Sequence, residues 1–278
     1  MDITANGIRH YVEIEGEGVP CFVICIAGTA LYQETLSPRL REELKLIFYE
    51  VRGSGRSDGD AEQVTLEQLA GDLEALRQSL GLGKVAVMGA SAPGLLALDY
   101  AHKYPDSVSR AILIGTPPHM KIAAEQERYW AAVATPARKA IHEQNVARLT
   151  EEKLKSLSPG VAWWARYASR GAMYFYDPAF DCSPYWVNSV VKREFVDRYF
   201  GELLTDFDRT EHFPEIQCPV FLAMGEHDYV VPPTLWAAYK DRFPRATWAL
   251  FKQSGHWPML EEPELFDRRL LHWLKGEG

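Results

Sequence analysis

The chain has 278 residues, 47% of them hydrophobic and 24% charged, which is typical of a globular protein and excludes a disordered one. Its formal net charge of −8 leaves no surplus of cations for phosphate backbones, so we expect no nucleic-acid partner. Because there is no apolar run of about 18 residues and no basic N-terminal stretch followed by an apolar one, we predict a cytoplasmic protein without a membrane span.

The first fifteen residues have the pattern of a hairpin at a sheet edge. Asn6-Gly7 separates two segments, 3–5 and 9–15, in which apolar and polar residues alternate. Three later runs are apolar without alternation, as expected for strands covered on both faces: 21–26, 46–49 and 85–88. These runs predict the centre of a parallel sheet.

Helical patterns alternate with the predicted strands. The clearest helix spans 65–80, where leucines recur at spacings of three and four, Thr65 can cap the start and Gly81 follows the end. The alternation continues through the segments 94–101, 108–114, 220–224, 233–241, 248–251 and 263–274. We therefore predict the α/β fold class, with a doubly wound, mostly parallel sheet flanked by helices.

The alternation stops between about residues 117 and 213. Helix-like segments follow one another there without strands between them, at 122–134, 136–149, 161–170 and 187–201. We predict a helical cap over 117–213, inserted into a core formed by 1–116 and 214–278. The segment is rich in aromatic residues, which fits a lid over an apolar pocket; a helical insertion that packs on itself would explain most of them equally well.

A serine stands on a tight turn between the strand at 85–88 and the next helix. Small residues flank Ser91 from Gly89 to Gly94, which is the layout of a nucleophile elbow, where the strained turn leaves little room. Pro93 occupies the position of the usual second glycine. Proline suits the first helical turn, and the amide of Ala92 remains available as an oxyanion donor.

A serine nucleophile needs a base, and a histidine base needs an acid that orients it. His256 follows the last predicted strand, in a loop at the carboxyl edge of the sheet, where sites in such sheets lie. Asp228 follows the penultimate strand and is our predicted acid, with Glu226 as a rival. Among the histidines set aside, His119 and His227 are the least securely excluded.

The loop after the third strand, 27–30, is the predicted source of the second oxyanion donor. The Thr29 amide is the first choice and Gly28 the alternative. The glycine-rich run 52–57 lacks the ending of a phosphate-binding loop, so we interpret it as a structural turn.

Neither a cofactor nor a metal ion is expected. No set of histidines, cysteines or carboxylates has the spacing of metal ligands. The four cysteines, Cys21, Cys25, Cys182 and Cys218, are scattered along the chain, and we expect reduced thiols rather than a disulfide framework.

These features together resemble the α/β-hydrolase superfamily over nearly the whole chain outside the cap. The run 49–57 looks like the family's Asp-x-Arg-Gly-x-Gly-x-Ser turn, with Glu50 in place of aspartate. The segments 176–181 and 228–233 look like those of its proline iminopeptidase-like branch. The resemblance implies an eight-stranded, mostly parallel sheet with the cap after the sixth strand. The loop 27–31 does not match the His-Gly-Gly-Pro-Gly of prolyl aminopeptidases.

The residues and the resemblance together predict a serine hydrolase with a small-molecule substrate. We expect cleavage of a small to medium, partly apolar ester, thioester or lactone through an acyl-enzyme on Ser91. The first alternative is a proline iminopeptidase-like aminopeptidase, with Asp177, Asp181 or Glu194 holding the substrate amine. An alternative from a different class is a ligand-binding pseudoenzyme. The sequence predicts no oligomeric state.

Overall fold

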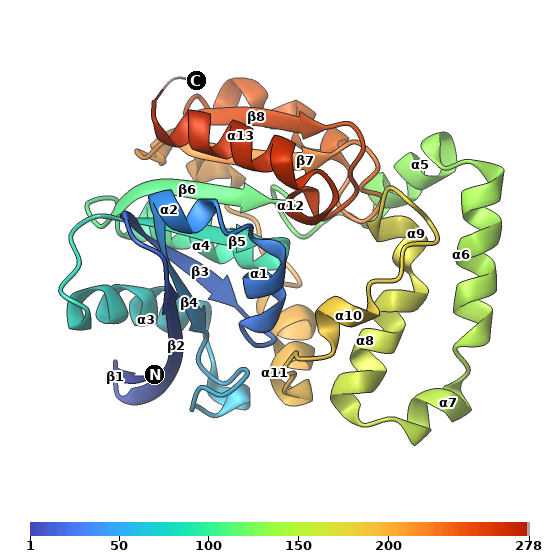
Figure 1. The fold of residues 1–278 in the computed structure, drawn as a ribbon, viewed down its shortest axis with the longest axis horizontal. Coiled ribbons are helices and arrows are strands. Elements are labelled where there is room, and N and C mark those ends of the chain that lie inside the picture. The colour runs from blue at the N-terminus through green and yellow to red at the C-terminus, as the bar shows by residue number, and fades with distance from the viewer. Residues whose placement is uncertain (277–278) are drawn as a thin grey trace.

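A computed structural model describes residues 1–276. In these residues one eight-stranded sheet has the order β1-β2-β4-β3-β5-β6-β7-β8 (Figure 1). Its strands are β1 (Asp2–Ala5), β2 (Ile8–Glu15), β3 (Val19–Cys25), β4 (Leu44–Glu50), β5 (Val85–Ala90), β6 (Val108–Ile114), β7 (Val220–Gly225) and β8 (Ala246–Phe251). β2 is antiparallel to β1 and β4, and the remaining neighbours are parallel. The predicted fold class is confirmed.

The hairpin at the sheet edge forms where the sequence predicts it. Asn6 and Gly7 have φ angles of 47° and 79°, so both lie in the left-handed region that a two-residue hairpin turn requires. Ala5 therefore pairs with Ile8, and β2 passes on to pair with β4. β1 is the terminal strand of the sheet.

Helices cover both faces of the sheet, because the central strands are apolar on both sides. Along β3, Phe22 packs in the hydrophobic cluster that includes Leu69 of α3 (Leu66–Ser79), whereas Val23 packs in the cluster that includes Leu270 of α13 (Pro263–Leu274). The helices of this part of the chain are α1 (Ala30–Thr35), α2 (Leu40–Glu43), η1 (Ala61–Gln63), α3 (Leu66–Ser79), α4 (Ala92–Lys103), the 3₁₀ helix η4 (Pro233–Arg242), α12 (Pro258–Glu261) and α13 (Pro263–Leu274).

The helix predicted at 65–80 begins with the expected cap. The Thr65 hydroxyl accepts a hydrogen bond from the Gln68 amide at 3.2 Å, and the Gln68 side chain accepts one from the Thr65 amide at 3.0 Å. This reciprocal pair satisfies amides that have no partner within the helix. Gly81 follows the helix with a φ of 62°.

The segment between β6 and β7 is helical and lies beyond the carboxyl ends of the parallel strands (Figure 1). We call the residues from α5 through η2, 123–203, the helical insertion. It contains α5 (Ala123–Val133), α6 (Pro136–Arg148), α7 (Glu151–Ser156), α8 (Pro159–Ser169), α9 (Gly171–Tyr174), α10 (Ser183–Trp186), α11 (Arg193–Arg198) and the π-helix η2 (Tyr199–Leu203), and the 3₁₀ helix η3 (Thr210–Glu215) leads into β7. The domain boundaries at 117 and 213 stay a prediction.

The helix predicted at 187–201 was placed too early. The α-helix begins only at Arg193, and 187–192 is irregular. Two physical causes act there. The Val190 amide donates to Ala27 O at 2.9 Å, which ties this segment to the loop after β3. The β-branched Val187, Val190 and Val191 also lose rotamer freedom in a helix.

Candidate active site

Ser91 occupies the turn between β5 and α4 in a strained conformation. Its φ of 60° is one of two positive values at non-glycine residues in the described chain, and such a conformation costs about 1–3 kcal/mol. A Cβ atom on Gly89 would lie 2.5 Å from the backbone of Pro93, which explains why the turn needs small residues. Pro93 lies in the first turn of α4, as predicted. Ala92 is the first residue of α4, so its amide has no hydrogen-bond acceptor within the helix.

The structure brings His256 and Asp228 into contact. His256 Nδ1 lies 2.6 Å from Asp228 Oδ2, and both side chains are buried. Asp228 Oδ1 accepts the amides of Val230 at 2.9 Å and Val231 at 2.7 Å, so the carboxylate cannot rotate freely. A carboxylate at Nδ1 holds the proton on that nitrogen and leaves Nε2 as the basic nitrogen of neutral His256. The rival Glu226 does not make this contact.

Gly115, at the end of β6, lies against the imidazole. Its φ is 53°, and a Cβ atom there would lie 2.7 Å from His256 O and 3.0 Å from His256 Nδ1. Only glycine combines this conformation with this close approach at little cost. The position of His256 therefore depends on a residue that lies 141 positions away in the chain by residue number (256 − 115).

Ser91, Ala92 and His256 line one cavity of about 190 Å³. Apart from Ser189, the rest of its wall is apolar or aromatic, and the aromatic residues from the helical insertion are Trp163, Trp164, Tyr167, Tyr174, Trp186 and Phe200. Ring contacts join the first five of these residues. Trp164 and Trp186 stack at 4.2 Å between centroids with planes 8° apart. Among the described residues that line the cavity there is no aspartate, glutamate, lysine or arginine.

The predicted oxyanion loop lies at the same cavity. Gly28 lines it, with a φ of 87°, whereas Thr29 is buried beside it at the start of α1. The Thr29 hydroxyl points into a polar network. It lies 2.8 Å from Gln33 Oε1 and 3.1 Å from Glu13 Oε1, and it accepts a hydrogen bond from Arg56 Nη2 at 3.0 Å.

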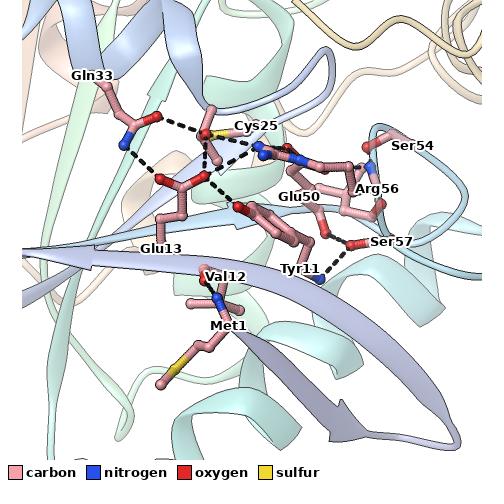
Figure 2. A network of polar contacts seen from close by, with 12 residues as sticks. Met1, Tyr11, Val12, Glu13, Cys25, Gln33, Glu50, Ser54, Arg56 and Ser57 are labelled. Carbon is pink, nitrogen blue, oxygen red and sulfur yellow. Dashed lines mark hydrogen bonds and ion pairs between the residues drawn. The ribbon is translucent and has the colours of Figure 1, made fainter.

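Arg56 links this loop to the turn at 49–57, and Figure 2 shows its side chain beside Glu13 and Glu50. Its Nε and Nη2 donate to Glu50 Oε1 at 2.9 and 2.5 Å, and its guanidinium carbon lies 3.5 Å from the centre of the Tyr11 ring. Glu50 is fully buried, so Arg56 supplies the charge that makes this burial tolerable. The glycine-rich run 52–57, which we interpret from the sequence as a structural turn, is thus hydrogen-bonded through Arg56 to the loop that carries Gly28 and Thr29.

Two glutamates that no sequence motif marks hold the loop of His256. Glu261 Oε2 accepts the Gly255 amide at 2.8 Å, and Glu262 Oε2 accepts the Gln253 amide at 2.8 Å. Their only signal in the sequence is their position just after His256, at the end of the short helix α12. Because exposed glutamates are common at such positions, that signal does not distinguish them.

The histidines set aside lie outside the wall of this cavity. His227 Nδ1 is 3.3 Å from the Tyr229 hydroxyl, and His119 forms a backbone bridge with Asp208. A separate cluster on α4 and η3 brings together His102, His212 and Glu215. The two imidazole rings stack with planes 22° apart, and such nearly parallel planes do not converge on one metal ion.

Residues 21–263 match the family described as the alpha/beta hydrolase fold. The chain is an α/β-hydrolase. This confirms the resemblance to the family and the fold predicted from the alternating strands and helices. The α/β-hydrolase is 29% identical over 276 residues to the AB hydrolase superfamily protein YclE of Bacillus subtilis (strain 168), covering 97% of this chain and 96% of that protein. It is 25% identical to a proline iminopeptidase of Lactiplantibacillus plantarum, over 82% and 81% of the two chains.

Among solved structures, the α/β-hydrolase shares its fold with an esterase from Exiguobacterium antarcticum. The TM-score is 0.72 at 22% identity, and the match covers 99% of each chain. Within residues 1–276, none of the α/β-hydrolase's helices has the length and apolar character needed to cross a membrane.

Proposed function

We propose that this α/β-hydrolase is a serine hydrolase that cleaves a small to medium ester-like substrate through an acyl-enzyme on Ser91. The observation that carries the proposal is the 2.6 Å contact between His256 Nδ1 and Asp228 Oδ2, beside the cavity that Ser91 lines. A serine is a weak nucleophile until a base takes its proton, and an oriented imidazole supplies that base.

In the proposed reaction, Ser91 Oγ attacks the substrate carbonyl while His256 Nε2 takes the hydroxyl proton. Asp228 stabilises the imidazolium without taking a proton itself. The amide of Ala92 and one amide of the loop 27–30 donate to the developing oxyanion. His256 then protonates the leaving group, and in the second half it activates the water that releases the acid from Ser91.

The second oxyanion donor is the amide of Thr29 or of Gly28. Gly28 is the one that lines the cavity, and Thr29 is held in place by Arg56. Thr29 remains our first choice because it is the N-cap residue of α1, where amides lack intrahelical acceptors. A donor of this kind is worth about 3 kcal/mol of barrier.

The cavity wall favours an uncharged, apolar acyl group. An apolar protein cavity of about 150 Å³ holds one benzene molecule, and the cavity at Ser91 is about 190 Å³. Its aromatic lining offers dispersion contacts, and the described residues that line it include no aspartate, glutamate, lysine or arginine to pair with a charge. We propose that the helical insertion acts as a cap and selects esters, thioesters or lactones with small apolar or aromatic acyl groups.

Among the residues that the structure describes, none gives this cavity the acidic group that the aminopeptidase alternative needs. Asp177 is exposed and accepts the Ala179 amide at 2.9 Å, and Asp181 is exposed and accepts the Ser183 amide at 2.9 Å. Glu194 is also exposed and lines an outer groove rather than the cavity of Ser91. A substrate ammonium would lose its hydration there without gaining a carboxylate, so we favour ester hydrolysis.

A fluorophosphonate probe tests the proposal, because it reacts with an activated serine. We expect labelling of the native protein at Ser91, none in Ser91→Ala, and turnover of p-nitrophenyl esters in preference to proline p-nitroanilide. Preferential turnover of the anilide would establish the aminopeptidase instead. Tight binding of apolar ligands, with neither labelling nor ester turnover, would establish the pseudoenzyme.

A further inference from the structure

The backbone around His256 is bonded directly to the helical insertion. The His256 amide donates to Tyr174 O at 2.6 Å, and the Tyr229 amide, next to Asp228, donates to Met173 O at 3.0 Å. The Tyr174 ring also meets the imidazole edge to face, with 5.5 Å between centroids. The loops of the candidate base and acid therefore both rest on α9.

Glu261 joins the same segment to the loop of His256. Its Oε1 accepts the Tyr176 amide at 2.6 Å, and its Oε2 accepts the Gly255 amide at 2.8 Å. Tyr176 belongs to the helical insertion, whereas Gly255 immediately precedes His256. One carboxylate thus bridges two segments that lie about 80 residues apart in the chain. Burial raises the pKa of Glu261 to about 7, while the backbone amides oppose the rise by stabilising its charged form.

Arg138 of α6 stands at the opposite end of the same peptide group. Its Nη1 donates to Phe175 O at 2.8 Å, and the Phe175–Tyr176 peptide points its N–H at Glu261. Arg138 is buried and donates to Ala172 O at 2.7 Å and to Tyr176 O as well. A cation at the oxygen end and a carboxylate at the N–H end of one peptide dipole stabilise each other through it.

We propose that Arg138 and Glu261 are positioning residues that lock the helical insertion to the His256 loop, so that the imidazole is in place only while the insertion is docked. This inference rests on the proposed function, since it concerns the base of that reaction. Arg138 holds the segment 172–176 from the side of the insertion, and Glu261 holds it from the side of α12. Because Tyr174 O accepts the His256 amide, a shift of this segment moves the base.

Neighbouring glutamates provide matched controls. Glu262 accepts hydrogen bonds from the Gln253 amide at 2.8 Å and the Ser254 hydroxyl at 2.7 Å, so it supports the same loop without touching residues 172–176 in the described contacts. Glu264 is exposed and controls for the loss of one negative charge. Comparing variants of Glu261, Glu262 and Glu264 distinguishes the loss of the link to the helical insertion from the loss of support for the His256 loop and from the loss of one charge.

The test is a pair of double-mutant cycles on the full-length protein, measured with a p-nitrophenyl ester. We expect Glu261→Gln and Arg138→Met each to lower kcat about ten- to a hundred-fold with KM changed less than about twofold, since small misplacements of catalytic groups cost such factors. The double variant should lose little more than either single one, whereas Arg138→Met combined with Glu262→Gln should multiply the losses. If Arg138→Met does not fold, Arg138→Lys takes its place, because it keeps the cation but loses the multiple donors.

A second measurement needs no turnover. The proton that His256 Nδ1 shares with Asp228 gives a far-downfield proton NMR signal, which we expect to shift or broaden in Glu261→Gln and Arg138→Met and to stay unchanged in Glu264→Gln. An unreactive wild-type protein would contradict the proposed function, while this signal would still report on the lock. Additive losses in the Arg138–Glu261 cycle, or an unchanged signal with kcat kept within about twofold, would overturn the inference.

Discussion

Asp228 contacts His256 through one carboxylate oxygen and accepts hydrogen bonds from its own turn through the other. Oδ2 lies 2.6 Å from His256 Nδ1, and Oδ1 accepts the amides of Val230 and Val231. This division of labour fixes which oxygen faces the histidine. An amide in place of the carboxylate would therefore also face His256 with one defined group.

Asp228→Asn should lower kcat by about four orders of magnitude and leave the fold intact. The amide oxygen must stay on Val230 and Val231, so the NH₂ group faces Nδ1 and forces the imidazole proton onto Nε2. His256 can then no longer take the Ser91 proton. Steady-state kinetics with a p-nitrophenyl ester and circular dichroism check this. Glu226→Gln is the control, and a larger loss in that variant than in Asp228→Asn would show that the acid was misassigned.

Gly115→Ala should displace His256 by steric contact while leaving the imidazole itself unchanged. The new Cβ would lie 2.7 Å from His256 O and 3.0 Å from Nδ1, at a φ of 53°. We expect a loss of stability of about 1–2 kcal/mol from the backbone conformation alone, together with a fall in kcat. Gly83→Ala is the control, because a Cβ there meets nothing within 4 Å. Equal kcat values in the two variants would contradict the proposed placement of His256.

Arg56→Gln should weaken both the fold and the loop 27–30. Buried Glu50 would lose its counter-charge, which costs about 3 kcal/mol, and the Thr29 hydroxyl would lose a donor. We expect denaturant melts to report the first effect and a fall in kcat larger than the rise in KM to report the second. Removing both charges, in Glu50→Gln/Arg56→Gln, should restore part of the stability. Unaltered kcat in Arg56→Gln would mean that this network does not position the loop.

Glu261 should leave a signature in the pH dependence of stability. Burial raises its pKa from 4.5 to about 7 in the folded protein, so between these values the folded state binds more protons than the unfolded state. Its contribution to the free energy of unfolding therefore falls as pH rises from about 4.5 to about 7, by up to about 3 kcal/mol. Urea titrations of wild type and Glu261→Gln should show this difference across that window. The difference between wild type and Glu264→Gln should not change with pH. If the difference in unfolding free energy between wild type and Glu261→Gln is also independent of pH, the Glu261 carboxyl is exposed to water.

The thiols should resist labelling in the native protein. All four cysteines are free and buried, and burial raises the pKa of Cys21 to about 12 and that of Cys218 to about 11. Since the thiolate is the reactive form, we expect slow reaction with Ellman's reagent at pH 8 and rapid release of four equivalents in denaturant. Rapid native labelling of one thiol would identify a segment that opens locally.

Much of this protein follows from short stretches of its sequence. The parallel strands, the capped helix α3 and the turn at Ser91 depend on neighbouring residues, so apolar runs, the capping residue Thr65 and the small residues around Ser91 predict them. The fold also brings Asp228 and His256 to one edge, because parallel strands end there. The helix before η2 was predicted too early, since the contact of Val190 with Ala27 has no local signal.

Tertiary structure alone decided how these parts meet. The sequence by itself determined the sheet, the serine on its turn, and two candidates for the acid. The folded chain placed Asp228 rather than Glu226 on His256 and set Arg138 and Glu261 on one peptide group. It also left the cavity wall, over residues 1–276, without an aspartate or glutamate. The physical reason is that hydrogen bonds and burial join residues far apart in the chain, and neither leaves a periodic pattern that a sequence could display.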